Sequence, residues 1–185
     1  MIYVALLRGI NVGGNNKIAM PNLSEVIEDL GFTEVATYIN TGNIIFSSNS
    51  RDQQAISQQI ESAIETGFGF EVNAIVRNHD NLKNLIEQIP ESWQNDKQTK
   101  SDVMFLWPKT DNESVLSELT IKDFDNVIYQ PGAILWSVSR NNQSRSGMKK
   151  LFGTNVYKQM TIRNVNTVRK IWEIMVRIKN EIEQT

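Results

Sequence analysis

The sequence contains no cysteine and a single histidine, His79. The absence of cysteine excludes disulfides, thiolate metal sites and cysteine nucleophiles. With one histidine, a histidine-rich metal centre is excluded, and a Ser-His-Asp triad would have to use His79. Carboxylates are plentiful, but none of them pair at a diagnostic spacing, so the sequence predicts no metal site and leaves any cofactor unknown.

The sequence also lacks a long apolar run, so no segment is expected to span a membrane. Its first eight residues lack the basic start and the small-residue cleavage site of a signal peptide. The absence of cysteine fits a reducing compartment, so we expect a cytoplasmic protein with no membrane partner. Of its 185 residues, 40% are hydrophobic and 22% are charged. This ordinary globular balance supplies a core for one or two domains.

In the first half, the hydrophobic periodicity predicts the element order β-α-β-β-α-β. The strands are expected at residues 2–8, 34–40, 43–48 and 70–77, and the helices at 21–30 and 52–66. Between the second and third strands, Asn40-Thr41-Gly42-Asn43 favours a tight turn, because Gly and Asn tolerate a positive φ. This order is the ferredoxin-like unit. A short helix over 82–89 then ends at Pro90.

The second half repeats the first in outline, after a polar and aperiodic linker at residues 91–100. Residues 38–47 and 129–137 both read as tyrosine, turn, glycine, apolar run, aromatic and serine. Strands are expected at 102–107, 125–130 and 133–138, and helices at 112–119, 146–152 and 164–183. We therefore predict an α+β protein with two ferredoxin-like subdomains, at 1–90 and 101–185, and a long C-terminal helix.

The charge is distributed unevenly along the chain. Residues 140–179 hold ten basic residues and one acid, a net charge of +9, whereas the rest holds nine basic and twenty acidic residues, a net charge of −11. Such asymmetry suggests an anionic partner. The alternative is that the basic side chains pair with acids from the other half of the chain.

Several segments resemble the bacterial family catalogued as domain of unknown function 1697. They are Arg8-Gly9-Ile10-Asn11-Val12-Gly13-Gly14, a helix start near residue 20, residues 38–46, and Arg163-Asn164-Val165-Asn166-Thr167. Members of the family typically carry Trp at the position of Val165, and Arg-Ser-Lys-Leu in place of Arg145-Ser146-Gly147-Met148. The resemblance covers essentially the whole chain and implies an α+β fold, but it implies no activity, cofactor or substrate.

The loop from Arg8 to Lys17 is a candidate anion site. Its glycines let backbone N–H groups approach a ligand, and the following helix N-terminus favours negative charge. It lacks the Gly-Lys-Ser/Thr ending of a Walker loop. The alternative is a crossover loop whose glycines serve chain geometry alone.

A second candidate is the start of the last helix, where Asn164 is a natural N-cap. Plain capping explains this segment, and a ligand role would add Arg163 and the free N–H groups of the first turn. Arg140, Arg145, Lys149 and Lys150 could converge there. Together the two segments and the hairpin give these candidate ligand-binding residues: Arg8, Asn11, Gly13, Gly14, Asn15, Lys17, Asn40, Asn43, Arg145, Arg163, Asn164, Asn166 and Thr167.

The sequence is compatible with three functions. The leading hypothesis is binding of a phosphate-bearing ligand, either a nucleotide or a nucleic acid. The second is an enzyme that acts on a small anionic metabolite through Arg and Lys electrostatics. The third is a protein-interaction module with no small ligand, of unknown oligomeric state.

Overall fold

The computed structural model describes residues 1–184, which form a mixed α+β protein with two four-stranded antiparallel sheets and a C-terminal helix. Contacts between residues divide the chain into two compact units. Unit 1 holds Met1–Leu82 and the chain from Ile171 on, and unit 2 holds Lys83–Lys170. Helices α3 (His79–Gln88) and α6 (Val165–Glu183) each cross the boundary. The units therefore differ in extent from the halves 1–90 and 101–185 expected from the sequence.

Unit 1 contains a sheet with the strand order β2-β3-β1-β4. Its elements before α3 are β1 (Ile2–Arg8), α1 (Met20–Asp29), β2 (Thr33–Thr37), β3 (Asn43–Ser47), α2 (Gln53–Phe68) and β4 (Asn73–Asn78). All pairings are antiparallel, and β1 lies between β3 and β4. The element order and types agree with the prediction for this part of the chain, with ends that differ by a few residues.

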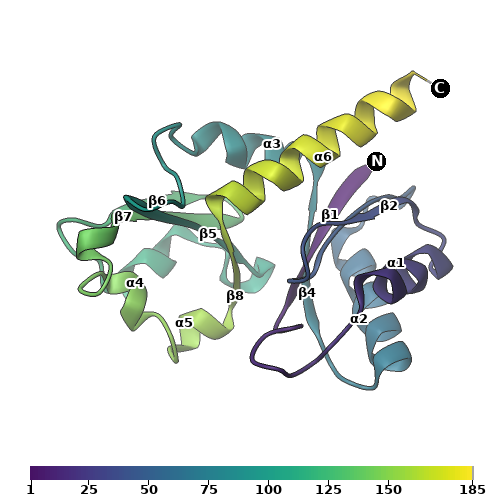
Figure 1. The fold of residues 1–185 in the computed structure, drawn as a ribbon, viewed down its shortest axis with the longest axis horizontal. Coiled ribbons are helices and arrows are strands. Elements are labelled where there is room, and N and C mark those ends of the chain that lie inside the picture. The colour runs from purple at the N-terminus through teal and green to yellow at the C-terminus, as the bar shows by residue number, and fades with distance from the viewer. Residues whose placement is uncertain (185) are drawn as a thin grey trace. The chain divides into compact units, whose positions relative to one another are not determined.

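The core of unit 1 lies between one face of this sheet and the helices α1 and α2 (Figure 1). Tyr3, Ala5 and Leu7 point into it from β1, as expected for alternate residues of a strand. Leu23 and Ile27 of α1 are fully buried against them. Asp52 caps α2 by accepting hydrogen bonds from the N–H groups of Gln54 and Ala55 at 2.9 and 3.0 Å, which fixes where this helix begins.

Unit 2 contains a second sheet with the corresponding strand order, β6-β7-β5-β8. Its strands are β5 (Thr99–Leu106), β6 (Asn126–Gln130), β7 (Ala133–Ser139) and β8 (Met160–Asn164). The helices between them are short: the 3-10 turns η1 (Pro108–Thr110), η2 (Glu113–Glu118) and η3 (Arg140–Asn142), and the α-helices α4 (Gly147–Lys150) and α5 (Asn155–Lys158). One face of the sheet packs Met104, Ile134 and Trp136 against Val115 of η2 and Met148 of α4.

The two hairpins make the same hydrogen bond to the first strand of their sheet. The N–H of Leu7 donates to the carbonyl of Gly42 at 2.8 Å, and the N–H of Leu106 donates to that of Gly132 at 2.9 Å. Both glycines have a positive φ, of 75° and 95°. At Gly42 a Cβ would lie 2.7 Å from the Cβ of Leu7, so the close approach itself requires glycine.

Unit 2 departs from the sequence prediction in three places. Strand β8 was not predicted, because two of its buried side chains, Thr161 and Arg163, are polar and hide the apolar pattern of a strand. The helix expected at 112–119 is the 3-10 segment η2, and the one expected at 146–152 is reduced to the four residues of α4. Short segments of this kind carry too few residues for a helical period to appear.

The segment expected to be a linker, residues 91–100, is packed within unit 2. Strand β5 begins at Thr99, and the N–H of Trp93 donates to the carbonyl of Pro90 at 2.9 Å. Arg169 donates to the carbonyls of Trp93 and Pro90, at 2.8 and 3.0 Å. The polar composition of residues 91–100 suggested a flexible linker. Instead, these residues make hydrogen bonds within unit 2. Within residues 1–184, no helix combines the length and apolarity needed to cross a membrane.

Candidate functional site

Asn11 holds the glycine-rich loop of unit 1 together. Its side-chain amide donates to the carbonyls of Ile18 and Asn40 at 2.9 and 2.8 Å, and its side-chain oxygen accepts the N–H of Ile18 at 2.9 Å. Asn11 has a φ of 53°, a conformation that Asn tolerates better than most residues. These bonds use the side chain of Asn11 to shape the loop, so it has little capacity left for a ligand.

Four of the predicted ligand residues border one cavity beside this loop. Asn11, Gly14, Lys17 and Asn40 line it together with residues 18–20, and its volume is about 450 Å³. The cavity lies at the start of α1, whose N-cap residue, Ala19, has no side chain that could cap the helix. Of the described residues, Lys17 is the one cation in the lining, and Pro21 removes one N–H donor from the first turn. The cavity is therefore polar but weakly cationic.

The other predicted residues of unit 1 do not line this cavity. Gly13 and Asn15 are exposed on the loop, and Arg8 is half-buried at the end of β1. Asn43 is fully buried, and its amide donates to the carbonyl of Tyr38 at 2.9 Å and to the hydroxyl of Thr41 at 3.2 Å. Asn43 thus shapes the hairpin from inside.

The start of α6 is accounted for by folding. Asn164 caps the helix by accepting the N–H of Thr167 at 2.9 Å, as predicted for an N-cap. The guanidinium of Arg163 donates to the hydroxyl of Thr161 at 3.0 Å and to the carbonyl of Ile162 at 2.9 Å. Arg163 is only 8% exposed, and its burial lowers its pKa to about 10. Asn166 exchanges hydrogen bonds with the backbone of Asn95, at 3.2 and 3.1 Å.

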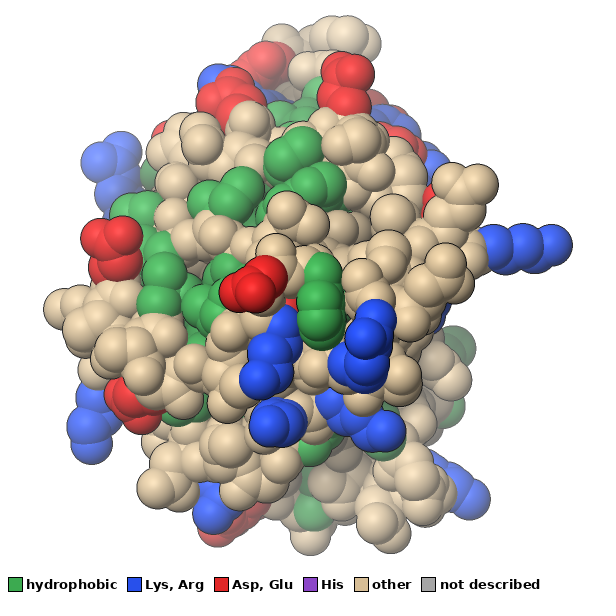
Figure 2. Space-filling view, turned by 90° about the vertical axis from the view of Figure 1, so that its left-hand side faces the viewer, with side chains coloured by type: hydrophobic (Ala, Val, Ile, Leu, Met, Phe, Trp, Pro, Cys, Tyr) green, Lys and Arg blue, Asp and Glu red, His purple; other side chains and the backbone are tan. Residues whose placement is uncertain are grey.

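Three cations of unit 2, Lys100, Arg140 and Lys149, line a different hollow, of about 350 Å³. We call it the cationic pocket; its lining residues are Lys100, Arg140, Gln143, Ser144, Met148, Lys149 and Phe152. Figure 2 shows Lys and Arg side chains gathered on one face, next to hydrophobic side chains and one acidic side chain. Of the residues that the structure describes, no carboxylate and no histidine line this pocket.

The pairing of β5 with β7 brings these residues together. Strands β5 and β7 are antiparallel, and Thr99 lies opposite Ser139. Lys100, the next residue of β5, and Arg140, the residue after β7, therefore lie at the same end of the sheet. The N–H of Arg140 then donates to the carbonyl of Gln98 at 2.8 Å as the chain enters η3. Helix α4 supplies Met148 and Lys149 from the next turn of chain. Lys100 thereby shares one hollow with residues from 140–152, a stretch about forty residues further along the chain.

Arg140 is held in place without a carboxylate partner. Its guanidinium donates to the carbonyl of Asp96, to the side-chain oxygen of Gln143 and to that of Asn95, at 2.9, 2.9 and 3.0 Å. A guanidinium has five N–H donors, so two remain for a ligand. The carboxylate of Asp96 has a lowered pKa, chiefly through hydrogen bonds from the N–H groups of Thr99 and Gln98, with Arg140 a minor cause. Arg140 thus presents a fixed positive charge to the pocket.

The other two cations of the pocket differ in how far their charge is neutralised. The ammonium of Lys100 lies 2.7 Å from a carboxylate oxygen of Asp102, so most of its charge is compensated. Lys149 is exposed and makes no ion pair with any of the residues 1–184. The predicted residue Arg145 lies outside this lining, where it donates to Asn142 and sits 5.4 Å from the ring centre of Phe124. Of the three cations, Arg140 and Lys149 therefore form no ion pair with a described residue, although the Asp96 carboxylate acts weakly on Arg140.

The sequence did not indicate this pocket. Arg140 and Lys149 were expected to converge on the start of α6, whereas the structure places them around the cationic pocket, whose lining includes neither Arg163 nor Asn164. Lys100 and Phe152 were not selected at all. Arg140, Lys149 and Phe152 lie within one stretch of thirteen residues, but no known motif has their spacing, and only the pairing of β5 with β7 brings Lys100 to them.

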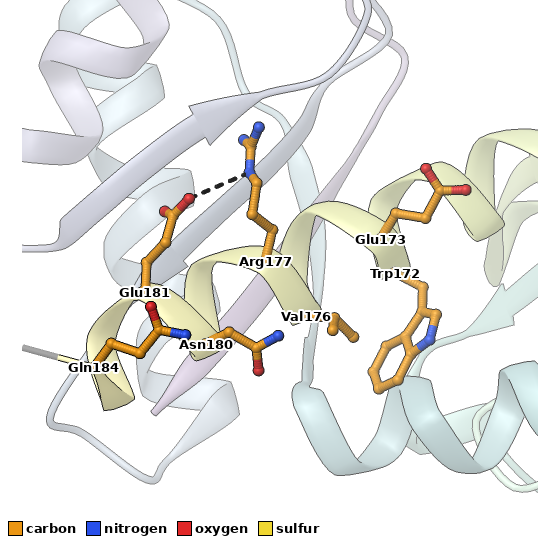
Figure 3. A pocket seen from close by; sticks show the side chains of 7 residues that line it. All are labelled: Trp172, Glu173, Val176, Arg177, Asn180, Glu181 and Gln184. Atoms are coloured by element: carbon orange, nitrogen blue, oxygen red, sulfur yellow. Dashed lines mark ion pairs between the residues drawn. The ribbon is translucent and has the colours of Figure 1, made fainter.

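A further hollow on α6, of about 430 Å³, carries both signs of charge. Figure 3 shows Arg177 pointing toward Glu181, with 3.9 Å between the side-chain nitrogen and oxygen, and Trp172 directed away from this pair. Glu173 also lines this hollow, so its acids outnumber its single arginine. The hollow does not favour an anion. Among residues 1–184, no group of three His, Asp or Glu side chains is arranged to hold a metal ion.

The fold and its pockets describe a two-unit α+β protein with a cationic hollow in one unit. The profile of the family described as "Protein of unknown function (DUF1697)" matches residues 1–136, and the chain belongs to this family. The chain is also similar to the solved structure of a conserved bacterial protein from Streptococcus pneumoniae. The sequence identity is 29% and the TM-score 0.81, over 94% of this chain and 98% of the other. No curated protein matches the chain.

Proposed function

We propose that this protein binds a phosphate-bearing ligand in the cationic pocket of unit 2. One observation carries the proposal: Arg140 and Lys149 line this pocket without carboxylate partners, and no carboxylate among the described residues lines it with them. Two cations that line one hollow without ion pairs favour an anion between them.

The geometry of Arg140 suits a phosphate group. Its planar guanidinium is oriented by three hydrogen bonds to neutral oxygens, so little side-chain freedom is lost when a ligand binds. The remaining donors match the oxygens of phosphate, which Arg contacts more directionally than Lys does. Lys149 adds a mobile point charge, and Gln143 and Ser144 add polar groups at the rim.

The charge of the whole unit favours the same ligand class. Unit 2 holds thirteen basic and nine acidic residues, a net charge of +4, whereas unit 1 holds six and twelve, a net charge of −6. A positive field around a cationic pocket raises the local concentration of anions and their rate of association. Because no acid or histidine among the described residues lines the pocket, binding is favoured over acid–base catalysis at this place.

The test is a calorimetric titration with pyrophosphate. We expect Lys149→Gln to weaken binding about tenfold, because it removes one uncompensated charge from the pocket. Lys150→Gln is the matched control, since Lys150 is the next residue of α4, is exposed like Lys149, and does not line the pocket. Equal affinities of the two variants, or no binding to the parent protein, would refute the proposal.

The glycine-rich loop is a second candidate for the same ligand class. Asn11, Gly14, Lys17 and Asn40 share its cavity at the start of α1, which supports the prediction made for these residues. If pyrophosphate binds in this cavity instead, Lys17→Gln lowers the affinity for pyrophosphate and Lys149→Gln leaves the affinity unchanged. The two variants thus assign the ligand to one cavity or the other.

We propose in addition that each unit is a ferredoxin-like domain of a cytoplasmic protein. The strand orders β2-β3-β1-β4 and β6-β7-β5-β8, both fully antiparallel, support this classification. The lack of cysteine supports the location. Fold analogy contributes nothing to the proposed activity, which depends on the pocket alone.

A further inference from the structure

Phe152 is an exposed aromatic side chain at the wall of the cationic pocket. It is 63% exposed, and no other aromatic residue of the described chain is among the exposed large hydrophobic side chains. Water contact with an aromatic ring is unfavourable, so an exposed ring beside a charged hollow is a feature that a ligand can use. Phosphate alone would leave this ring in water.

The position of the Phe152 ring is supported from behind. Its centroid lies 5.0 Å from that of Tyr157, with the two rings tilted by 50°. Tyr157 in turn packs against the core of unit 2. The tilted arrangement is favourable for aromatic pairs and limits how far the Phe152 ring can swing. An aromatic surface with restricted motion suits stacking, because little freedom is lost when a planar group covers it.

The pocket therefore combines two recognition elements. Arg140 and Lys149 supply positive charge without an acid, and Phe152 supplies an apolar face within the same lining. Proteins that bind single-stranded nucleic acids and nucleotides use this combination, with cations on the phosphates and aromatic rings under the bases. A cavity of about 350 Å³ is near the lower end of small-ligand sites, which suits one nucleotide unit.

We infer that the ligand of the cationic pocket is a nucleotide unit whose base stacks on Phe152 while its phosphates contact Arg140 and Lys149. This inference rests on the proposed phosphate-binding function and adds to it a contact between the base and Phe152. The nucleotide unit has two sources, a free nucleotide or one residue of a single-stranded nucleic acid. Both present the same base and phosphate chemistry to the pocket.

The experiment compares adenosine 5′-diphosphate with pyrophosphate by calorimetric titration of the parent protein. We expect the nucleotide to bind at least tenfold more tightly, since the base adds a stacking contact. Phe152→Leu should reduce this ratio to about one, because leucine keeps an apolar side chain but offers no aromatic face. Phe152→Tyr should retain the ratio, and Lys149→Gln should weaken both ligands together.

The outcomes separate this inference from the proposed function. If pyrophosphate binds and the nucleotide binds no better, phosphate binding stands and the base contact is refuted. An unchanged ratio in Phe152→Leu also refutes it. If neither ligand binds the parent protein, both proposals fail. A single-stranded hexanucleotide that binds more tightly than the free nucleotide, and that loses this advantage in Phe152→Leu, supports the inference and identifies a nucleic acid as the source.

Discussion

Units 1 and 2 carry corresponding strand orders but cover the core face of their sheets with different elements. In unit 1, two regular helices of 10 and 16 residues lie on that face. In unit 2 the same place is taken by the 3-10 segment η2 and by α4 and α5, which have four residues each. Long helices bury a continuous apolar stripe, whereas short turns leave backbone and polar side chains near the surface.

The difference in cover accompanies a difference in charge and in the kind of hollow. Unit 1 has a net charge of −6, and the cavity beside its loop has one cation in the lining. Unit 2 has a net charge of +4, and its short segments η3 and α4 build the cationic pocket. A sheet of one strand order can therefore support a regular helical layer or a loop-built site, depending on what connects its strands.

The largest expected effect is at Gly147, where the irregular cover of unit 2 is tightest. A Cβ at this position would lie 1.4 Å from the carbonyl oxygen of Thr120, which is backbone and cannot rotate away. We expect Gly147→Ala to destabilise the protein by about 3 kcal/mol through overpacking. Thermal or urea unfolding of the variant measures the loss.

The matched control lies in the regular helix of unit 1. A Cβ at Gly67 of α2 would meet only a methyl group of Val26, at an ordinary 3.5 Å. Gly67→Ala should therefore stabilise the protein by roughly 0.5–1 kcal/mol, because alanine favours a helix. If both alanine variants shift the free energy of unfolding in the same direction, the tight packing at Gly147 does not explain the effect of its substitution.

A second prediction concerns the loop of unit 1. Asn11→Ala removes the side chain that joins this loop to Ile18 and Asn40, and it places alanine at a positive φ. We expect a loss of about 2 kcal/mol in the free energy of unfolding. Asn15→Ala, on the same loop, should change it by less than about 0.5 kcal/mol, since Asn15 is exposed. Similar losses in the two variants would show that Asn11 does not organise the loop.

A third prediction concerns Asp125, whose carboxylate ties the short turns of unit 2 together. It accepts the hydroxyl of Ser146 and the N–H groups of Gly147 and Lys122, the latter two at 3.0 Å. Burial acts to raise the pKa of Asp125, but these hydrogen bonds outweigh burial and hold the pKa below its usual 3.8. We expect Asp125→Asn to cost roughly 1.5 kcal/mol at neutral pH.

The pH dependence of stability follows from the sign of this shift. Because the folded pKa is lowered, the stabilisation from Asp125 is complete above the unfolded pKa and is lost as the pH falls through the folded value. The difference in unfolding free energy between the parent and Asp125→Asn should therefore shrink below about pH 4. A constant difference between pH 7 and pH 2 would contradict this account.

The smallest effect is expected at the cap of α2. Asp52→Ala removes two hydrogen bonds from the helix start in unit 1, and we expect a loss of about 1 kcal/mol. Asn164→Ala removes the corresponding bond at α6 and should cost a similar amount. Circular dichroism during thermal unfolding measures both. A null result at Asp52 would show that packing alone fixes the start of α2.

The sequence predicted the elements of unit 1 well, because each has a strong local signal. The stripe of Leu23 and Ile27 repeats at the helical period, and Gly42 marks a turn that needs a positive φ. In unit 2 the signals are weaker: β8 hides two polar residues, and the segments η2 and α4 are too short to show a period. The predicted cap at Asn164 is confirmed, since its own side chain makes the bond.

The candidate site was predicted in part. Asn11, Gly14, Lys17 and Asn40 were named from the sequence and do share one cavity, although Asn11 is used to hold the loop. Arg163 was named for its charge, but its side chain is buried and bonded within β8. Charge is visible in a sequence, whereas burial depends on which residues the rest of the fold places around it.

By itself, the sequence determined the family, the alternation of strands and helices in unit 1, the hairpin turns and the cap at Asn164. These depend on backbone geometry and on hydrogen bonds between residues a few positions apart. Only the tertiary structure decided that Lys100, Arg140, Lys149 and Phe152 surround one pocket. The pairing of Thr99 with Ser139 joins segments forty residues apart, and such long-range register is set by the packing of the whole sheet.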